Sequence, residues 1–174
     1  MRAELIDTAG SFAALENEWG ELLASSWSES PFLTWEWLYA WWTHLCGSRR
    51  LALVVIRDGH RLAAIAPFCA SRWRGPLFRR WELLGTGFAG SDYLDGIVRK
   101  GHDVEASRVL AEFVGSRRIA LHLDHLPQDS WLSRLEAPLI GSGWTARVTD
   151  RGVCPFIRLA GHTWDSFLAT IGPS

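Results

Sequence analysis

A chain of 174 residues is long enough to bury most of its apolar side chains in one core, which predicts a single folded domain. Hydrophobic residues make up 48% of the sequence and charged residues 21%, and these shares exclude an intrinsically disordered chain. Eighteen basic and nineteen acidic residues nearly cancel, so no overall field draws the protein toward nucleic acid or anionic lipid.

The apolar runs are too short for a membrane span. Even the longest, such as residues 51–56, fall far below the roughly 20 residues that a transmembrane helix needs. The N-terminus lacks the apolar stretch of a signal peptide, so we expect a cytoplasmic location. The cysteines Cys46, Cys69 and Cys154 are odd in number and widely spaced, which favours reduced thiols over a disulfide framework. Lys100 is the single lysine, and this arginine bias is typical of a G+C-rich bacterial coding sequence.

The first fifty residues predict a strand followed by two helices. Residues 3–7 are expected to form the strand, and apolar positions at helical spacing in residues 11–23 predict a helix capped by Ser11. Thr34 is the expected cap of a second helix over residues 34–45. Tryptophan and leucine surround much of this helix, so we expect it to be deeply buried or docked on a partner.

The middle of the chain predicts a hairpin followed by further extended segments. Residues 51–57 and 61–70 are apolar runs on either side of an Asp58-Gly59 turn signal, which predicts a hairpin. Residues 81–84 and 93–98 are expected to be extended as well, with a glycine-rich loop between them.

A second α/β section follows. Asp103 is the expected cap of a helix that ends at Gly115, and alternation over residues 119–123 predicts a strand. Asp129 or Ser130 is expected to open a short helix. Pro138 is expected to close it.

Two last strands are predicted at residues 144–149 and 155–159, and Thr163 is the expected cap of a final short helix. The whole order is therefore β-α-α-β-β-β-α-β-α-β-β. This order predicts an α/β (α+β) fold with a mixed, mostly antiparallel sheet flanked by helices.

That succession resembles the fold of the GNAT superfamily of acetyl-coenzyme A-dependent N-acetyltransferases. Local segments are further similar to the N-terminal half of cellulose-biosynthesis CelD-type acetyltransferases. They are residues 31–38 with Trp41-Trp42, residues 65–68, residues 91–95 and residues 164–168.

The resemblance implies a domain division and an activity. It assigns residues 1–162 to one GNAT-like domain, and residues 163–174 to the start of a helix that would lead into a second GNAT-like unit. It implies transfer of an acetyl or acyl group from acetyl-coenzyme A to an amine acceptor, either a small molecule or a glycan, in polysaccharide or cell-envelope metabolism. The partner it implies is a second GNAT-like unit or a homodimer.

The resemblance also indicates where the cofactor would bind. Family members hold the pyrophosphate on backbone N–H groups at the start of their third helix, where glycine allows close approach. The matching residues are Arg99, Lys100, Gly101 and His102. One glycine is present, and Asp103 adds a carboxylate near the expected phosphates. An alternative therefore stays open: a catalytically inactive half that packs on a second unit or partner and shapes its substrate cleft.

Asp92, Tyr93 and Asp95 are the candidate catalytic residues. An acidic pair beside a phenol can bind an amine and accept its proton during attack. The alternative is structural, with Asp92 capping the loop and Tyr93 packed. Residues 125–140 contain no tyrosine to protonate the leaving thiolate, and Ser130, a weak substitute, is interpreted first as a helix cap.

Three further patterns give weaker indications of a functional site than the segments above. Glycines within residues 85–90 match a dinucleotide motif, but an extended stretch rather than a helix follows, which disfavours a Rossmann site. His122, Asp124 and His125 favour a polar rim over a metal site, because no fourth ligand has a recognisable spacing. The arginines and tryptophans of residues 72–81 suit a local anion or partner site, and packing of the rings explains them equally well.

Overall fold

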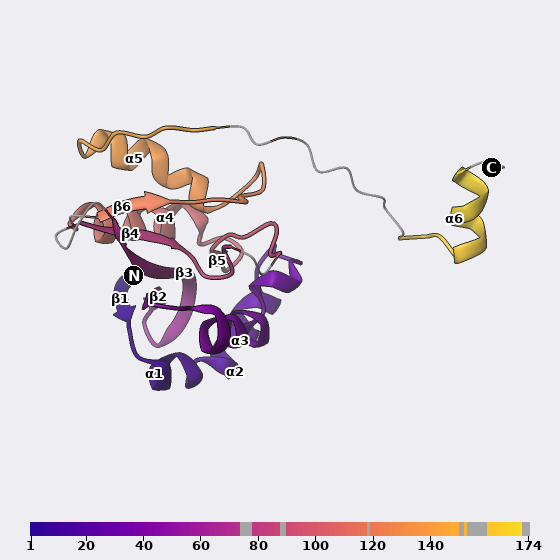
Figure 1. Cartoon of the computed structure of the whole chain (residues 1–174), viewed down its shortest axis with the longest axis horizontal. Coiled ribbons are helices and arrows are strands. Elements are labelled where there is room, and N and C mark those ends of the chain that lie inside the picture. Colours follow the sequence, from indigo (N-terminus) through magenta and orange to yellow (C-terminus); the bar gives the residue numbers. More distant parts are fainter. Residues whose placement is uncertain (74–77, 88–89, 118, 150–151, 153–159, 172–174) are drawn as a thin grey trace.

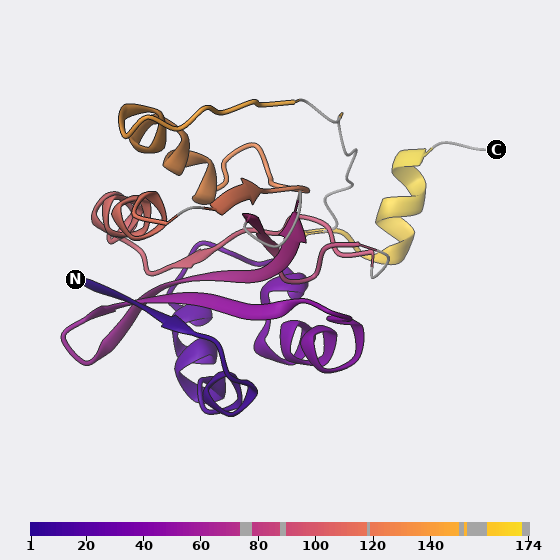
Figure 2. The ribbon, with the colours of Figure 1, turned by 60° about the vertical axis from the view of Figure 1, so that its left-hand side comes forward.

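The computed structural model describes residues 1–73, 78–87, 90–117, 119–149, 152 and 160–171. An open mixed sheet forms its centre, with α1, α2 and α3 on one side and α4 and α5 on the other (Figures 1 and 2). The predicted α/β class with a mixed sheet is confirmed.

The described part of the sheet contains six strands in the order β1-β2-β3-β4-β6, with β5 also paired to β3. All pairs are antiparallel except β4 with β6. The strands are β1 (Arg2–Ile6), β2 (Arg50–Asp58), β3 (Arg61–Trp73), β4 (Phe78–Leu83), β5 (Ile97–Val98) and β6 (Ile119–His122).

Strands β4 and β5 behave as one interrupted strand along β3. Leu83 is the register partner of Phe68, and Ile97 is the partner of Ile65, so the two strands cover successive parts of the same neighbour. Residues 85–87 and 90–96, which lie between them in the sequence, are outside the sheet. Strand β6 pairs with β4 but not with β5, so the sheet opens beyond the end of β4. This opening positions the site described below.

The helices and 3-10 turns have these bounds: α1 (Ala9–Ala13), α2 (Glu16–Ala24), η1 (Pro31–Leu33), α3 (Trp35–Leu45), α4 (Asp103–Gly115), η2 (Leu132–Leu135), α5 (Glu136–Gly141) and α6 (Trp164–Ile171). Thr34 caps α3 as predicted, because its hydroxyl accepts the N–H of Trp37. The first helix differs from the prediction. Its cap is Thr8, which accepts the N–H of Ser11, and the expected single helix is divided into α1 and α2.

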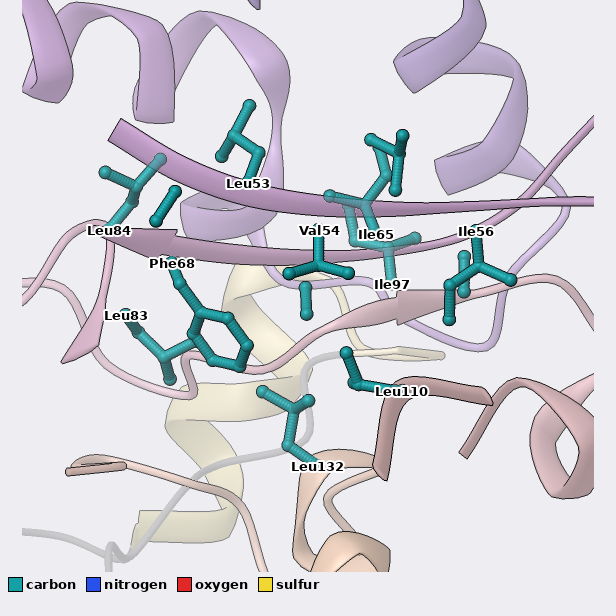
Figure 3. Packing of buried hydrophobic residues seen from close by; sticks show 14 of the residues in the cluster. Leu53, Val54, Ile56, Ile65, Phe68, Leu83, Leu84, Ile97, Leu110 and Leu132 are labelled. Carbon is teal, nitrogen blue, oxygen red and sulfur yellow. The ribbon is translucent and has the colours of Figure 1, made fainter. Parts of the chain in front are cut away.

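The core fills both faces of the sheet. Strand β2 is buried continuously from Leu51 to Ile56, because helices cover the sheet on each side. Figure 3 shows Leu53 and Val54 near the centre of this packing, with Leu110 of α4 and Leu132 of η2 beneath the sheet. Each fully buried leucine or phenylalanine side chain stabilises the fold by about 1.5–3 kcal/mol.

Several predicted elements differ in the structure. The extended run expected at residues 93–98 is reduced to β5, because Tyr93 has a left-handed backbone with φ 53°. Pro138 lies within α5 instead of ending a helix, and Asp103 is the first residue of α4, with His102 at the cap position. Residues 144–149 form no strand, and no described strand pairs with them. The strand predicted at residues 155–159 lies outside the described residues.

The last described helix, α6, has no buried residue. Figure 1 shows it apart from the sheet and its flanking helices. Within the described ranges, no helix combines the length and apolar character needed to cross a bilayer. The predicted domain boundary at residue 162 stays a prediction.

Candidate functional site

A pocket of about 450 Å³ lies beside β5, at the edge of the opening in the sheet. Three segments far apart in sequence contribute most of its lining: the loop after α2, the chain around the start of β5, and the residues around the start of η2. Leu33 of η1 and Asp103 of α4 complete it. Its lining residues are Ser26, Trp27, Ser28, Glu29, Ser30, Leu33, Tyr93, Asp95, Gly96, Val98, Asp103, Pro127, Asp129, Trp131 and Arg134.

The charged lining is mainly acidic. Among the described residues that line it, Glu29, Asp95, Asp103 and Asp129 are acidic and Arg134 is basic. Glu29 and Asp129 are exposed, Asp103 is half-buried and Asp95 is buried. Because opposite charges attract more strongly where water is partly excluded, this pocket favours a cation over an anion.

Asp95 is buried and accepts hydrogen bonds from both sides of the opening. Its Oδ1 accepts Gly96 N–H at 2.7 Å, Ser130 Oγ–H at 2.8 Å and Leu132 N–H at 3.0 Å. Its Oδ2 accepts Trp131 N–H at 2.7 Å. Burial raises the pKa of Asp95, and the hydrogen bonds from Leu132, Ser130, Trp131 and Gly96 act in the opposite direction. The carboxylate therefore joins the chain before β5 to the start of η2.

Trp131 closes the opening in the sheet next to Asp95. Its ring lies against Gly96 so closely that a Cβ added at this glycine would be 2.5 Å from ring carbons. The indole N–H donates to the carbonyl oxygen of Asp103 at 3.2 Å, which ties η2 to the start of α4. The residue directly before the start of β5 is therefore covered by an aromatic ring.

The structure places Tyr93 and Asp95 on one pocket and Asp92 outside its lining. Tyr93 is 44% exposed. Asp92 pairs with His125, and Asp92 Oδ1 is 3.4 Å from His125 Nδ1. His125 has a left-handed backbone with φ 61°, as Tyr93 has on the facing loop. The sequence interpretation placed His125 on a polar rim and did not name Asp92 as its partner, since nothing local in the sequence links the two residues.

Arg99, a predicted cofactor ligand, has its guanidinium group inside the fold. Nε and Nη2 donate to the carbonyl oxygen of Leu62 at 3.2 and 3.1 Å. Nη1 donates to Ser25 Oγ at 2.7 Å, and Nη2 lies 3.4 Å from Glu21 Oε1. The side chain is 10% exposed, so its charge is used to join α2 to β3.

The other three predicted cofactor ligands follow Arg99 directly in the chain. They are Lys100, Gly101 and His102, and Lys100 contacts the pocket residue Trp27. Lys100 Nζ is 4.3 Å from the centroid of the Trp27 ring. Gly101 has φ +81°, which explains the glycine, and no atom lies within 4 Å of a Cβ added there. His102 Nδ1 is 3.2 Å from the carbonyl oxygen of Lys100, and its Nε2 is 3.9 Å from Asp58 Oδ2.

Sequence reasoning missed the pocket wall that residues 26–30 contribute. Trp27 within a serine-rich stretch was the signal present in the sequence, because an isolated tryptophan among serines has no helical or strand period to bury it. Asp129 and Trp131 were interpreted only as parts of a short helix. Their position opposite Trp27 depends on the tertiary structure.

Other candidate chemistry finds less support. In the described part of the chain, no three His, Cys, Asp or Glu side chains are grouped to hold a metal ion. Burial raises the pKa of the Cys69 thiol to about 12, so it stays protonated at neutral pH and is a poor nucleophile. Cys154 lies outside the described residues. Trp81 is buried against Phe68, so this ring of the 72–81 segment serves packing.

Comparisons of the chain with protein-family models, curated proteins and solved structures find no significant match.

Proposed function

We propose that this chain is a GNAT-like acyltransferase-type domain that binds an amine acceptor and does not itself hold the coenzyme A donor. The observation that carries the proposal is the acidic pocket, in which Glu29, Asp95, Asp103 and Asp129 outnumber Arg134. A protonated amine is the ligand that this charge distribution favours. The proposal combines the two functions open at the level of sequence. It keeps the amine acceptor of the acyltransferase, and it takes from the catalytically inactive half the second unit whose substrate cleft the chain shapes.

The residues predicted to bind acetyl-coenzyme A give weak support to a diphosphate site. The Arg99 guanidinium group is bonded to groups of the fold. The first turn of α4 carries Asp103 and Glu105, which stabilise the helix but repel phosphate from its N–H groups. Asp95 also accepts the N–H of Trp131, whose ring lies against Gly96 next to β5. The proposal therefore assigns the acyl donor to a second unit.

The reaction served by such a module is acyl transfer to nitrogen. The bound ammonium group first loses one proton to a base. The neutral amine then attacks the thioester, the C–S bond breaks and the amide C–N bond forms, and the leaving thiolate takes up the second proton lost by the nitrogen. Tyr93 lines the pocket, and Asp92 with His125 lies on the loops next to it. Asp92 and Tyr93 stay the predicted candidates for positioning the amine or accepting its proton.

Isothermal titration calorimetry on the whole chain tests this proposal. We expect glucosamine to bind and N-acetylglucosamine, its uncharged counterpart, to bind more weakly, because acetylation removes the ammonium group. Asp129→Asn should weaken glucosamine binding about two- to fivefold, as expected for an exposed ion pair. Acetyl-coenzyme A should give no heat of binding. Equal binding of both sugars, or micromolar binding of acetyl-coenzyme A that is lost in Lys100→Gln, would refute the proposal.

A further inference from the structure

Trp27 is a fixed aromatic surface at the rim of the pocket. The side chain is 75% exposed although its neighbours are well anchored. Ser26 is buried, and its hydroxyl donates to the carbonyl oxygen of Leu23 at 2.8 Å and accepts Ser28 N–H at 3.1 Å. The loop therefore holds the indole ring out toward solvent, where packing does not explain it.

The backbone places Lys100 opposite this ring. Lys100 N–H donates to the carbonyl oxygen of Ser25 at 3.0 Å, and Ser26 forms an isolated antiparallel bridge with Arg99. The bridge therefore holds the two segments side by side. Trp27 directly follows Ser26 on one segment, and Lys100 directly follows Arg99 on the other. The contact between Lys100 Nζ and the Trp27 ring, 4.3 Å to the centroid, thus arises between anchored backbones.

We propose that the Trp27 ring is an ammonium-binding subsite of the pocket, and that the Lys100 ammonium group occupies it in the absence of ligand. A cation within about 6 Å of a tryptophan centroid is attracted by the negative face of the ring. Lys100 is the single lysine of the chain, so the ring holds the one primary side-chain ammonium group that the protein contains. The inference rests on the proposed amine-binding function and specifies how the amine is recognised.

The neighbouring charges explain how a ligand would displace Lys100. At an exposed site the contact between an ammonium group and an indole ring is weak. A free amine in the pocket can make that contact and also approach Glu29 and Asp129, which line the same pocket. A ligand with a primary ammonium group on a polar body, such as an amino sugar, therefore competes with the side chain.

If Lys100 competes with the ligand, its removal should strengthen ligand binding. If Lys100 instead bound the phosphates of a cofactor, its removal should weaken cofactor binding. Removing the side chain frees the Trp27 ring and removes a positive charge near the incoming amine. Lys100→Gln should therefore bind glucosamine about two- to fivefold more tightly than the wild-type chain, the range expected for an exposed cation–π contact. Trp27→Leu should weaken glucosamine binding by a similar factor. Trp164→Leu, at a 70% exposed tryptophan on α6, is the matched control and should leave binding unchanged.

The single lysine allows a direct test by NMR spectroscopy. Reductive methylation with ¹³C-formaldehyde labels Lys100 and the N-terminal amine and keeps both charges, and Lys100→Arg identifies the lysine signal. We expect the Lys100 methyl signal to be shifted upfield by the Trp27 ring current and to return to the position of free dimethyl-lysine in Trp27→Leu. Glucosamine should move the wild-type signal the same way, and N-acetylglucosamine should not.

The outcomes separate the two proposals. A Lys100 signal at the free position that does not respond to Trp27→Leu would refute the subsite, whatever calorimetry shows. Glucosamine that binds by calorimetry but leaves the shifted signal unmoved would also refute the subsite, while the proposed function would stand. A shifted signal with no glucosamine binding, in the wild-type chain or in Lys100→Gln, would refute both.

Discussion

Asp95 combines two roles that a sequence cannot separate. It was predicted as a catalytic acid or base, and it does line the pocket. Its oxygens nevertheless accept three backbone N–H groups and the Ser130 hydroxyl, so the carboxylate also acts as the cap of η2. Carboxylates that cap a turn and carboxylates that bind a substrate are the same residue type. The difference lies in which donors surround the oxygens.

Asp95→Asn should destabilise the fold. The amide keeps one oxygen acceptor, but its NH₂ group would face the Trp131 N–H, which would lose its acceptor. An unsatisfied buried donor costs about 1–3 kcal/mol of unfolding free energy, measurable by urea denaturation. Asp92→Asn, at an exposed carboxylate, is the control and should change the unfolding free energy by less than about 0.5 kcal/mol.

The cost of Asp95→Asn should also depend on pH. Because burial raises the pKa of Asp95 above its ordinary value of 3.8, the folded state binds the proton more tightly than the unfolded state. The stability that this titration contributes is complete below the unfolded pKa and is lost as pH rises through the folded pKa. The difference between wild type and variant should therefore shrink as urea denaturation is repeated at rising pH from about 4. A difference that grows with pH would contradict this sign.

At the scale of elements, the interruption between β4 and β5 shapes the site. A continuous strand here would keep residues 90–96 in the sheet and leave no loop to carry Tyr93 and Asp95 to the pocket. Residues 90–96, here called the excursion, are also attached to α3, since Trp37 donates its indole N–H to Ser91 Oγ at 3.0 Å. The tryptophan-rich helix, expected to be buried or docked on a partner, buries Leu38 and Trp41 and leaves Trp37 37% exposed.

Gly96→Ala should show how tightly η2 closes that interruption. The added methyl group would lie 2.5 Å from the Trp131 ring and 3.0 Å from the carbonyl oxygen of Ile65, so the ring must move. We expect a loss of about 1–3 kcal/mol in thermal or urea unfolding, the usual range for overpacking. In contrast, Gly20→Ala in α2 meets no atom within 4 Å and should stabilise by up to about 1 kcal/mol. Equal effects of both substitutions would show that Trp131 does not restrain Gly96.

At the scale of the whole molecule, stability is concentrated in the sheet and the helices that cover it. Among the described residues, the buried apolar side chains come from α1 to α5, η1, η2, strands β2 to β5, and four residues between these elements, Leu15, Leu84, Leu94 and Trp131. Helix α6 contributes none, and Trp164, Leu168 and Ile171 are exposed on it. An apolar helix surface of this kind is typical of a segment that packs on another unit.

Removal of residues 163–174 should leave the remaining chain folded with the same urea midpoint and m-value. The reason is that α6 buries no side chain, so its loss exposes little surface on unfolding. Circular dichroism and fluorescence should report one coincident transition for both lengths. A fall in unfolding free energy of more than about 1 kcal/mol would show that α6 packs on the domain.

The sequence by itself determined the elements whose signals are local. The cap at Thr34 and the hairpin around Asp58-Gly59 were predicted correctly, because hydrogen bonds and turn geometry within a few residues decide them. A local sequence pattern gave a wrong prediction where partners far away in the sequence decide the secondary structure. Residues 144–149 alternate like a strand, yet no described strand lies beside them to pair with their backbone.

Only the tertiary structure decided the site. It brought the loop of Trp27, the excursion of Tyr93 and Asp95 and the approach to η2 to one pocket, although these segments are separated by tens of residues. It also directed Arg99 into the fold and Lys100 onto an aromatic ring. Neither outcome can be read from residue type, because the charge of an arginine or lysine is equally suited to a phosphate, a carbonyl oxygen or an indole ring. Which of these it contacts depends on the neighbours that the fold supplies.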